Sequence, residues 1–246
     1  MEVTEGIRRI GGGVANVYLV EEAGEITIVD AGMPGHYTEL LRELRTMGRS
    51  LADIRAVVLT HGHSDHIGFA ERVRRERSVP VRIHEADASL ARGEVPNPSK
   101  GFGRVKFVPL LRFLLYGLRR GGLKRPVVAE VATYGDGATL DLPGSPLTIL
   151  APGHTPGSAA LHFAGRRVLM VGDVFATLGV TTGRRGPQVA PFTADEPAAL
   201  ASLDRLAGLD AAVSLPGHGE PWRGSVDEAV RLVRASVSGS AARARR

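Results

Sequence analysis

The sequence contains no cysteine. Disulfide bonds, thiolate metal ligands and cysteine nucleophiles are therefore excluded, which leaves histidine and carboxylate side chains as the groups that can bind a metal ion. Long apolar runs are also missing. The longest stretch, residues 108–118, is interrupted by Arg112 and is about half the roughly 20 residues that a membrane-spanning helix requires. Glu2 and Glu5 are acidic where a signal peptide would be basic, so we expect a cytoplasmic protein.

The composition is that of an ordinary globular chain, with 43% hydrophobic and 23% charged residues among 246, which excludes wholesale disorder. We expect a single domain over residues 1–246. Two segments stand apart from it, a basic and apolar insert at about 96–126 and a tail from about residue 238 that we expect to be disordered. The net charge of +5 gives only weak support for an anionic partner.

Hydrophobic periodicity gives a coarse order of elements. Residues 16–19 and 26–29 read as a hairpin, and the spacing of apolar residues over 37–47 predicts a helix. A buried strand at 54–60 ends at His61, and a second helix is expected from about 67 to 77. Further strands are predicted at 80–84, 147–150, 159–163, 168–171 and 212–215, with helices at 196–207 and 225–237. A strand-rich half that ends in a helix therefore occurs twice.

One cluster of polar residues carries the chemistry. His61, His63, Asp65 and His66 lie within six residues at the end of the predicted strand 54–60. Four lone-pair donors repel one another or lose solvation unless a cation is present, and divalent zinc or iron accepts imidazole nitrogen and carboxylate oxygen together. Alternation in an extended segment would aim His61 and His63 the same way and leave Asp65 and His66 for a neighbouring position. Two adjacent metal positions are the simplest outcome.

Three later residues meet the same demand for ligands. His154, Asp173 and His218 each follow a strand-like run and sit in a glycine-rich turn, where small neighbours permit close approach of the backbone to a buried ion. By contrast, His36, His84 and His162 have no ligand-like neighbours, and we expect them to be structural or solvent-facing.

The pattern His-x-His-x-Asp-His at 61–66, followed in order by His154, Asp173 and His218, resembles the metallo-β-lactamase superfamily over about residues 16–218. The resemblance implies an α+β fold, a four-layer αββα sandwich of two similar β-rich halves, with metals at one edge between the sheets. By that similarity His61, His63 and His154 would hold one metal, Asp65, His66 and His218 the other, and Asp173 would bridge them. Asp30 resembles the family's aspartate that supports a ligand, with a simple turn carboxylate as the alternative.

The resemblance further implies a dinuclear hydrolase that uses two divalent metal ions, with zinc favoured and iron or manganese as alternatives. Two such cations can share a water and supply a metal-bridging hydroxide as nucleophile. We assign Asp65 a double role, as ligand and as the group that orients or shuttles the proton of the nucleophile. The expected reaction is hydrolysis of a small-molecule acyl bond, in an ester, lactone or thioester.

The pattern is closest to hydrolases of the glyoxalase II and lactonase type, although lactonases typically place a tyrosine where this sequence has Ala176. Two alternatives stay open. One is an oxidoreductase that resembles the persulfide dioxygenases and uses a single iron, and the other is a phosphodiesterase or nuclease attracted by the basic segment. Nucleic acid is otherwise not expected as a partner.

Residues 96–126 are the main individual feature. They contain eight lysines and arginines, and no acidic residue occurs between Glu94 and Glu130. We interpret the segment as a substrate lid that accepts an apolar or acyl chain and an anionic group. A helix that touches a membrane surface and a contact in a homodimer are the other two interpretations.

Overall fold

The computed structural model describes residues 1–99, 101 and 105–244, with side chains up to residue 237. A seven-stranded sheet has the order β1 to β7, with bounds Glu2–Thr4, Ile7–Ile10, Val17–Glu22, Glu25–Val29, Ile54–Val58, Val81–His84 and Ala132–Tyr134. A five-stranded sheet has the order β14-β13-β10-β9-β8, and its strands in chain order are Leu147–Leu150, Ala159–Phe163, Val168–Gly172, Val213–Pro216 and Trp222–Arg223. A small hairpin joins β11 (Ala176–Leu178) to β12 (Arg185–Gln188).

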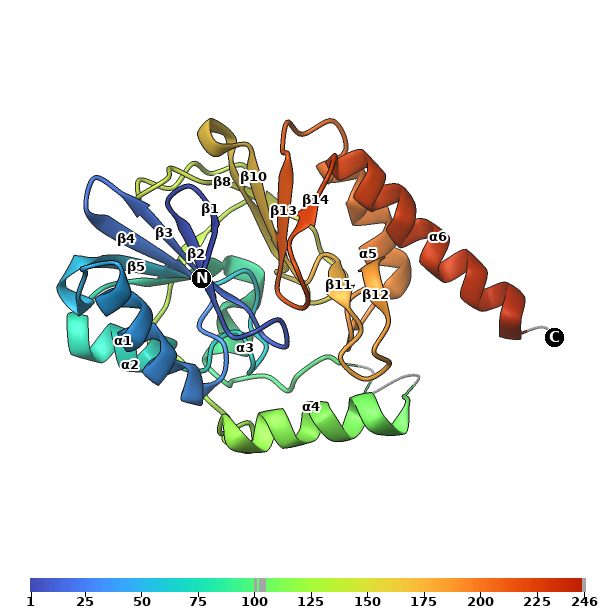
Figure 1. Ribbon diagram of the computed structural model, residues 1–246, viewed down its shortest axis with the longest axis horizontal. Helices are drawn as coiled ribbons and strands as arrows, with labels where there is room; N and C mark the ends of the chain where they lie inside the picture. Colours follow the sequence, from blue (N-terminus) through green and yellow to red (C-terminus); the bar gives the residue numbers. More distant parts are fainter. Residues whose placement is uncertain (100, 102–104, 245–246) are drawn as a thin grey trace.

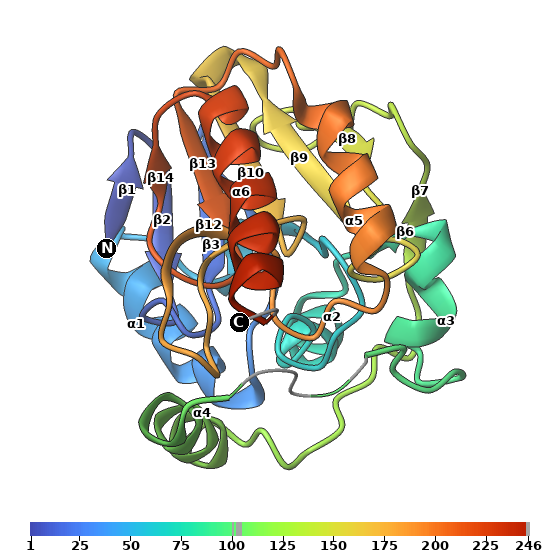
Figure 2. The ribbon, with the colours of Figure 1, turned by 90° about the vertical axis from the view of Figure 1, so that its right-hand side faces the viewer.

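Helices cover the outer face of each large sheet (Figures 1 and 2). Those on the first sheet are α1 (Tyr37–Thr46), α2 (Ala70–Arg77) and α3 (Ala88–Ala91), and those on the second are α5 (Glu196–Ser202) and α6 (Val226–Ala244). Helix α4 (Phe107–Arg119) lies outside these layers. The 3-10 turns are Pro34–His36, Leu51–Asp53, Glu85–Asp87, Ala164–Arg166 and Leu203–Leu206.

Alternation along the strands explains why the layers stack. In β3, Val17 and Leu19 face the core under α1 and α2, whereas Tyr18 and Val20 face the core between the two sheets. Strand β10 repeats the pattern, because Val168 and Met170 face the core between the two sheets, whereas Leu169 and Val171 face the core under α6. A period of two buries both faces of each sheet. The predicted four-layer αββα sandwich is confirmed.

The strand directions explain where polar side chains gather. Strands β4 and β5 are parallel, as are β10 and β13, and β8 runs in the direction of β10 because both pair antiparallel with β9. The carboxyl ends of these strands therefore meet at one edge, where loops collect ligand-binding residues in many α/β folds. The cluster at 61–66 lies in the loop after β5. His154 follows β8, Asp173 follows β10 and His218 follows β13.

The predicted elements agree with the observed ones except at boundaries. The helix expected over 37–47 is α1, but the helix expected from 67 begins at Ala70, because residues 63–69 form turns instead. Gly68 packs so closely on the preceding loop that an added Cβ would collide with the carbonyl oxygen of Gly32. Strands β1, β2, β7, β11, β12 and β14 carry no sequence signal that we recognised.

The insert forms α4 and its flanking loops. None of the helix residues is fully buried, and no helix among the described residues is long and apolar enough to cross a membrane. The tail that we expect to be disordered from residue 238 coincides with the last turns of α6 up to Ala244, and its final residues, 245–246, lie outside the described residues. The disorder of the tail stays a prediction.

Candidate metal centre

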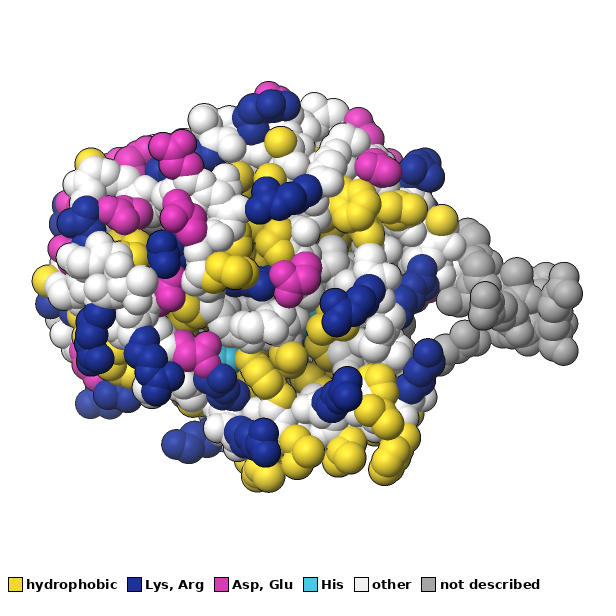
Figure 3. All heavy atoms as spheres, in the orientation of Figure 1, with side chains coloured by type: hydrophobic (Ala, Val, Ile, Leu, Met, Phe, Trp, Pro, Cys, Tyr) yellow, Lys and Arg dark blue, Asp and Glu magenta, His cyan; other side chains and the backbone are white. Residues whose placement is uncertain are grey.

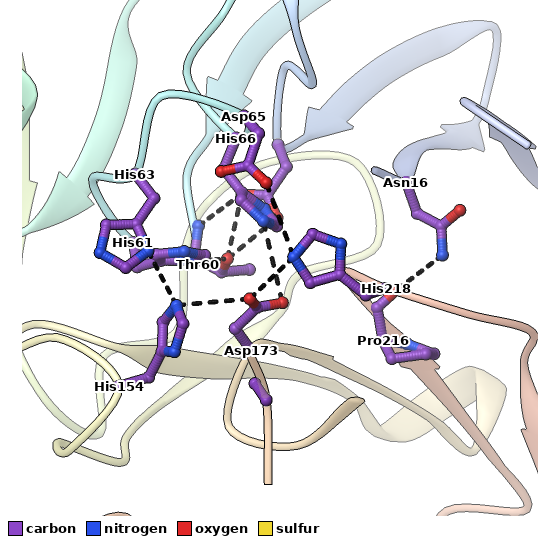
Figure 4. A network of polar contacts seen from close by, with 12 residues as sticks. Asn16, Thr60, His61, His63, Asp65, His66, His154, Asp173, Pro216 and His218 are labelled. Carbon is purple, nitrogen blue, oxygen red and sulfur yellow. Dashed lines mark hydrogen bonds and ion pairs between the residues drawn. The ribbon is translucent and has the colours of Figure 1, made fainter. Parts of the chain in front are cut away.

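Seven predicted ligands converge at the edge between the two sheets (Figure 4). Their nitrogen and oxygen atoms form three overlapping groups, within each of which the atoms lie within 4.8 Å of one another. The groups are His61, His63 and His154; His61, His66 and Asp173; and Asp65, His66 and His218. The first and third groups coincide with the two metal positions expected from the sequence.

Asp173 lies between these two positions. Its Oδ2 atom is 3.3 Å from Nε2 of His154 and 3.1 Å from Nε2 of His218, and its Oδ1 atom is 3.8 Å from Nε2 of His66. One carboxylate therefore faces imidazoles of both groups, as a bridging ligand would. Asp65 is the more open ligand, with 18% of its side chain exposed, and its Oδ2 atom is 3.6 Å from Nε2 of His218.

Hydrogen bonds fix which ring nitrogen of each histidine is free. A carboxylate only accepts, so the Thr60 hydroxyl donates to Asp30 and its oxygen accepts from Nδ1 of His61 at 3.0 Å. Nδ1 of His66 donates to Oδ2 of Asp30 at 2.9 Å. Nδ1 of His218 donates to the carbonyl of Val14. The Nε2 lone pairs of these three imidazoles are left for a ligand.

His154 follows the same rule. The Thr193 hydroxyl donates to the carbonyl oxygen of Ala190 at 2.9 Å, so its oxygen accepts from Nδ1 of His154 at 3.1 Å. Nε2 of His154 then points into the site, where it lies 2.9 Å from Nδ1 of His63. A partner that holds Nδ1 and turns Nε2 toward the site is the usual arrangement of histidines that bind metals.

The buried atoms without partners fit a cation. Among the described residues, Nε2 of His61 and His66 and Oδ1 of Asp173 are buried and make no hydrogen bond, and these three residues form one group of possible ligands. A buried polar atom without a partner costs about 1–3 kcal/mol, and here three such atoms lie in one site. Divalent cations satisfy imidazole nitrogen and carboxylate oxygen together. The residues present therefore fit a metal centre.

The charges of the site point the same way. Burial and the neighbouring imidazoles hold the pKa of His61 well below its ordinary value, and burial lowers the pKa of His154 to about 3. At His66 burial acts in the same direction, but Asp173, Asp30 and Asp65 outweigh it and raise the pKa to about 10. The carboxylates thus require a nearby positive charge, which a metal ion can supply in place of a proton.

Asp30 supports the site from behind, as one of the two sequence interpretations held. It accepts hydrogen bonds from the amide and hydroxyl of Thr60 as well as from His66. Its φ of 60° places it in the left-handed region, which aspartate tolerates better than most residues. The backbone conformation turns the carboxylate toward two histidine-bearing segments.

Asp87 is a residue that the sequence interpretation missed. It is completely buried and accepts hydrogen bonds from the amide of Gly62 at 2.8 Å, the amide of Gly157 at 2.7 Å and the hydroxyl of Thr155 at 2.7 Å. These donors belong to the loop of His61 and His63 and to the loop of His154. Asp87 therefore ties the two loops of the first metal position together, although it touches no ligand.

A cleft of about 480 Å³ opens from His63 and Asp65 toward α4. Its walls are mostly apolar and include Met33, Phe113, Leu114, Leu118, Leu123 and Phe192, with Lys124 at the rim. The cleft joins the candidate metal centre to the insert.

Phe192 has a strained backbone at this cleft. Its φ of 63° is unusual for a bulky side chain and indicates a conformation held by its surroundings. The ring lies 5.9 Å from that of Phe113 on α4, centroid to centroid, and the next residue, Thr193, holds His154. Sequence reasoning had no signal for this residue, because the strain exists only in the folded chain.

The remaining histidines behave as expected. Nδ1 of His36 accepts from the amide of Met33, His84 accepts from the amide of Ala86, and His162 bonds to the carbonyl of Asp210. None of the three belongs to the groups of possible ligands found among the described residues.

The fold and the site together are those of a metallo-hydrolase. The family model described as the metallo-beta-lactamase superfamily matches residues 10–218, and the chain belongs to that superfamily. It is 30% identical over 240 residues to the protein named probable metallo-hydrolase YflN of Bacillus subtilis (strain 168), an alignment that covers 91% of this chain and 87% of that protein. It is 29% identical over 175 residues to acyl-coenzyme A thioesterase MBLAC2 of Bos taurus, with 66% of this chain and 59% of that protein covered.

Solved structures agree on the fold. The metallo-beta-lactamase family protein TTHA1429 from Thermus thermophilus has a TM-score of 0.69 at 24% identity, over 97% of this chain and 81% of that chain. A B3 metallo-beta-lactamase with an active-site glutamic acid has a TM-score of 0.72 at 20% identity, over 100% of this chain and 91% of the other. At these identities the likeness concerns the fold alone.

Proposed function

We propose that this protein is a dinuclear metal-dependent hydrolase of an acyl bond in a small molecule that carries an apolar acyl group. The observation that carries the proposal is the cleft between the candidate metal centre and α4, because it places an apolar wall beside His63 and Asp65, which also line it. Small-molecule sites are usually clefts of this size with a few polar groups at one end.

Seven side chains would hold the two cations, in the division that the observed groups suggest, with Asp173 between them. The donor set favours zinc and also suits iron and manganese. When bound, such cations supply Lewis acidity for a carbonyl oxygen and lower the pKa of water to near neutrality.

The chain's own residues would position the substrate. Phe113, Leu118 and Phe192 offer an apolar surface for the acyl chain, and the ammonium group of Lys124 at the rim can pair with an anionic group. This assignment of the cleft residues corresponds to the interpretation of residues 96–126 as a substrate lid. The name of the bovine relative, an acyl-coenzyme A thioesterase, supports thioesters among the possible substrates.

Asp65 is proposed to handle the proton of the attacking water. Burial opposes ionisation of its carboxyl group, but the charges of His66 and His218 lower its pKa below the ordinary value. The carboxylate is therefore ionised at neutral pH and, as the most exposed of the seven side chains at the cleft, can accept a hydrogen bond from a reactant.

The test begins with elemental analysis of protein purified without added metal, followed by assays with ester, lactone, acyl thioester and phosphodiester substrates. Two equivalents of zinc, iron or manganese and turnover of an acyl substrate would support the proposal. One equivalent of iron with oxygen consumption would favour the persulfide-dioxygenase alternative, and turnover of the phosphodiester alone would favour a nuclease.

Asp65→Asn tests the proton role directly. We expect a loss of about 10²–10⁴ in kcat, while at least one equivalent of metal is retained. Asp141→Asn, the same change at an exposed carboxyl far along the chain, is the matched control and should leave kcat unaltered. Near-normal turnover of Asp65→Asn would refute the assigned role.

A further inference from the structure

The outer face of α4 is apolar and exposed. Phe107 is 77% exposed, Leu118 58% and Val108 53%, and Leu111, Leu114 and Leu115 are each more than 40% exposed. These positions recur every three or four residues, so they form one stripe along the helix. A stripe of this kind on a protein surface marks a site of interaction.

Basic side chains flank the stripe. Lys106, Arg112, Arg119, Lys124 and Arg125 are exposed, and none of them makes an ion pair with another described residue. Elsewhere in the described chain arginines commonly pair with carboxylates, as Arg49 does with Glu21 at 2.6 Å. The contrast follows from composition, because residues 95–129 contain no aspartate or glutamate.

The helix lies where a flat surface can reach it. Figures 1 and 2 both place α4 at the outer edge of the molecule, below the layers of sheets and helices. Figure 3 shows hydrophobic side chains along this lower edge with lysine and arginine side chains among them. No other helix or strand of the described residues lies below α4 in these two views.

The helix is held firmly in this position. The Tyr116 hydroxyl donates to the carbonyl of Gly11 at 2.6 Å and lies 2.6 Å from Nε2 of His36. Arg120 forms an ion pair with Glu39, and the carbonyl of Arg120 accepts from the amide of Gly35 at 2.9 Å. Because its inner face is anchored, the apolar stripe cannot turn inward without breaking these contacts.

We propose that α4 binds the surface of an anionic lipid bilayer, with its apolar stripe in the headgroup and acyl boundary and its basic side chains on lipid phosphates. Interfacial helices combine these two features, since neither a short apolar face nor a few cations binds stably alone. A second copy of the chain is the weaker occupant. A two-fold contact through α4 would bring Arg112 and Arg119 of both copies together without a carboxylate to neutralise them.

The placement has a consequence that rests on the proposed function. Leu114 and Leu118, at the edge of the stripe, and Leu123, which follows α4, are exposed and also line the cleft of the candidate metal centre. A helix bound to lipid therefore sets the mouth of the cleft beside the bilayer, from which an acyl-bearing substrate can enter.

The experiment measures partition of the metal-loaded chain of 246 residues onto vesicles by co-sedimentation. Vesicles of phosphatidylcholine alone are compared with vesicles that also contain about 30% phosphatidylglycerol. We expect binding at least tenfold stronger to the anionic vesicles, and weaker binding at high salt. Arg112→Glu/Arg119→Glu should reduce it by at least 25-fold, at about fivefold for each cation removed.

A second variant tests the apolar stripe. Phe107→Ser/Leu111→Ser/Leu115→Ser changes side chains that do not line the cleft, and it should abolish binding while metal content and turnover of a soluble ester persist. Arg75→Glu, an exposed arginine on α2, is the matched charge control and should bind like the unaltered protein.

Each outcome decides the matter. Equal binding to neutral and anionic vesicles, or binding that survives either α4 variant, would overturn the proposal. A dimer in light scattering that the serine variant dissociates, without vesicle binding, would assign the face to a second copy instead. Hydrolytic activity is scored separately, so failure of the membrane proposal leaves the proposed function intact, and the reverse also holds.

Discussion

Asp87 provides the sharpest test of how the candidate metal centre is held. In Asp87→Ala, the Thr155 hydroxyl can turn to Oγ of Ser158, 2.8 Å away, but the amides of Gly62 and Gly157 lose their buried acceptor. At about 1–3 kcal/mol for each orphaned donor, we expect a loss of about 4 kcal/mol in the free energy of unfolding. For a chain of this length that corresponds to a fall in Tm of about 10 °C.

Asp87→Asn should lie in between. An amide oxygen at the Oδ2 position still accepts from Gly62 and Thr155, but the amide nitrogen then faces the N–H of Gly157, and two donors repel each other. We expect a smaller loss of stability, about 2 kcal/mol. The geometry of the hydrogen bonds therefore predicts that stability decreases from the unaltered protein to Asp87→Asn and further to Asp87→Ala.

The assay joins thermal unfolding to metal titration against a chromophoric chelator. Because the two braced loops carry His61, His63 and His154, we expect metal affinity to fall by about 10–100-fold in Asp87→Ala. Asp210→Ala is the control, since its carboxylate is 73% exposed and pairs only at the surface with Arg167. If the alanine variant lost stability but bound metal normally, Asp87 would be a packing residue and the reasoning would be wrong.

Three further predictions concern neighbouring residues. Asp30→Asn keeps the left-handed backbone but weakens the hold on His66, so metal affinity measured by chelator competition should fall by about tenfold or more, and an unchanged affinity would contradict this. Burial lowers the pKa of His36 from 6.5 to about 4. Below pH 6.5 the unfolded chain therefore takes up a proton that the folded chain does not, so the free energy of unfolding falls as the pH is lowered to about 4. The loss is at most about 3 kcal/mol, and His36→Asn should flatten this part of the pH profile of urea unfolding of the metal-free protein. Phe192→Ala should raise KM for a long acyl substrate more than for an acetyl ester, whereas an equal change in both would argue against its place in the acyl wall.

The convergence of the candidate ligands was predictable from one local cluster together with the resemblance to a known family. Three histidines and an aspartate in six residues have few structural explanations, and parallel strands bring His154, Asp173 and His218 to the same edge. The layers were predictable for a similar reason, since alternating apolar residues must bury both faces of each sheet.

The supporting residues were not predictable, because their signals are tertiary. Asp87 stands in an ordinary polar turn, and its importance arises only when the loops of Gly62 and Gly157 approach it. Phe192 looks like any loop aromatic until the fold forces its backbone into the left-handed region. The insert gave three interpretations from composition alone, and the structure adds that its helix is anchored at Tyr116 and faces the cleft on one side.

The position of α4 outside the sandwich bears on how such a protein can evolve. No residue of the helix is fully buried, whereas the candidate metal centre is built entirely from loops of the two sheets. Exchange of the helix would therefore leave the three hydrophobic cores undisturbed. Changes in α4 can therefore alter which substrates fit the cleft while the metal-binding residues stay the same. Recombination that exchanges this helix is a route to new substrate specificity.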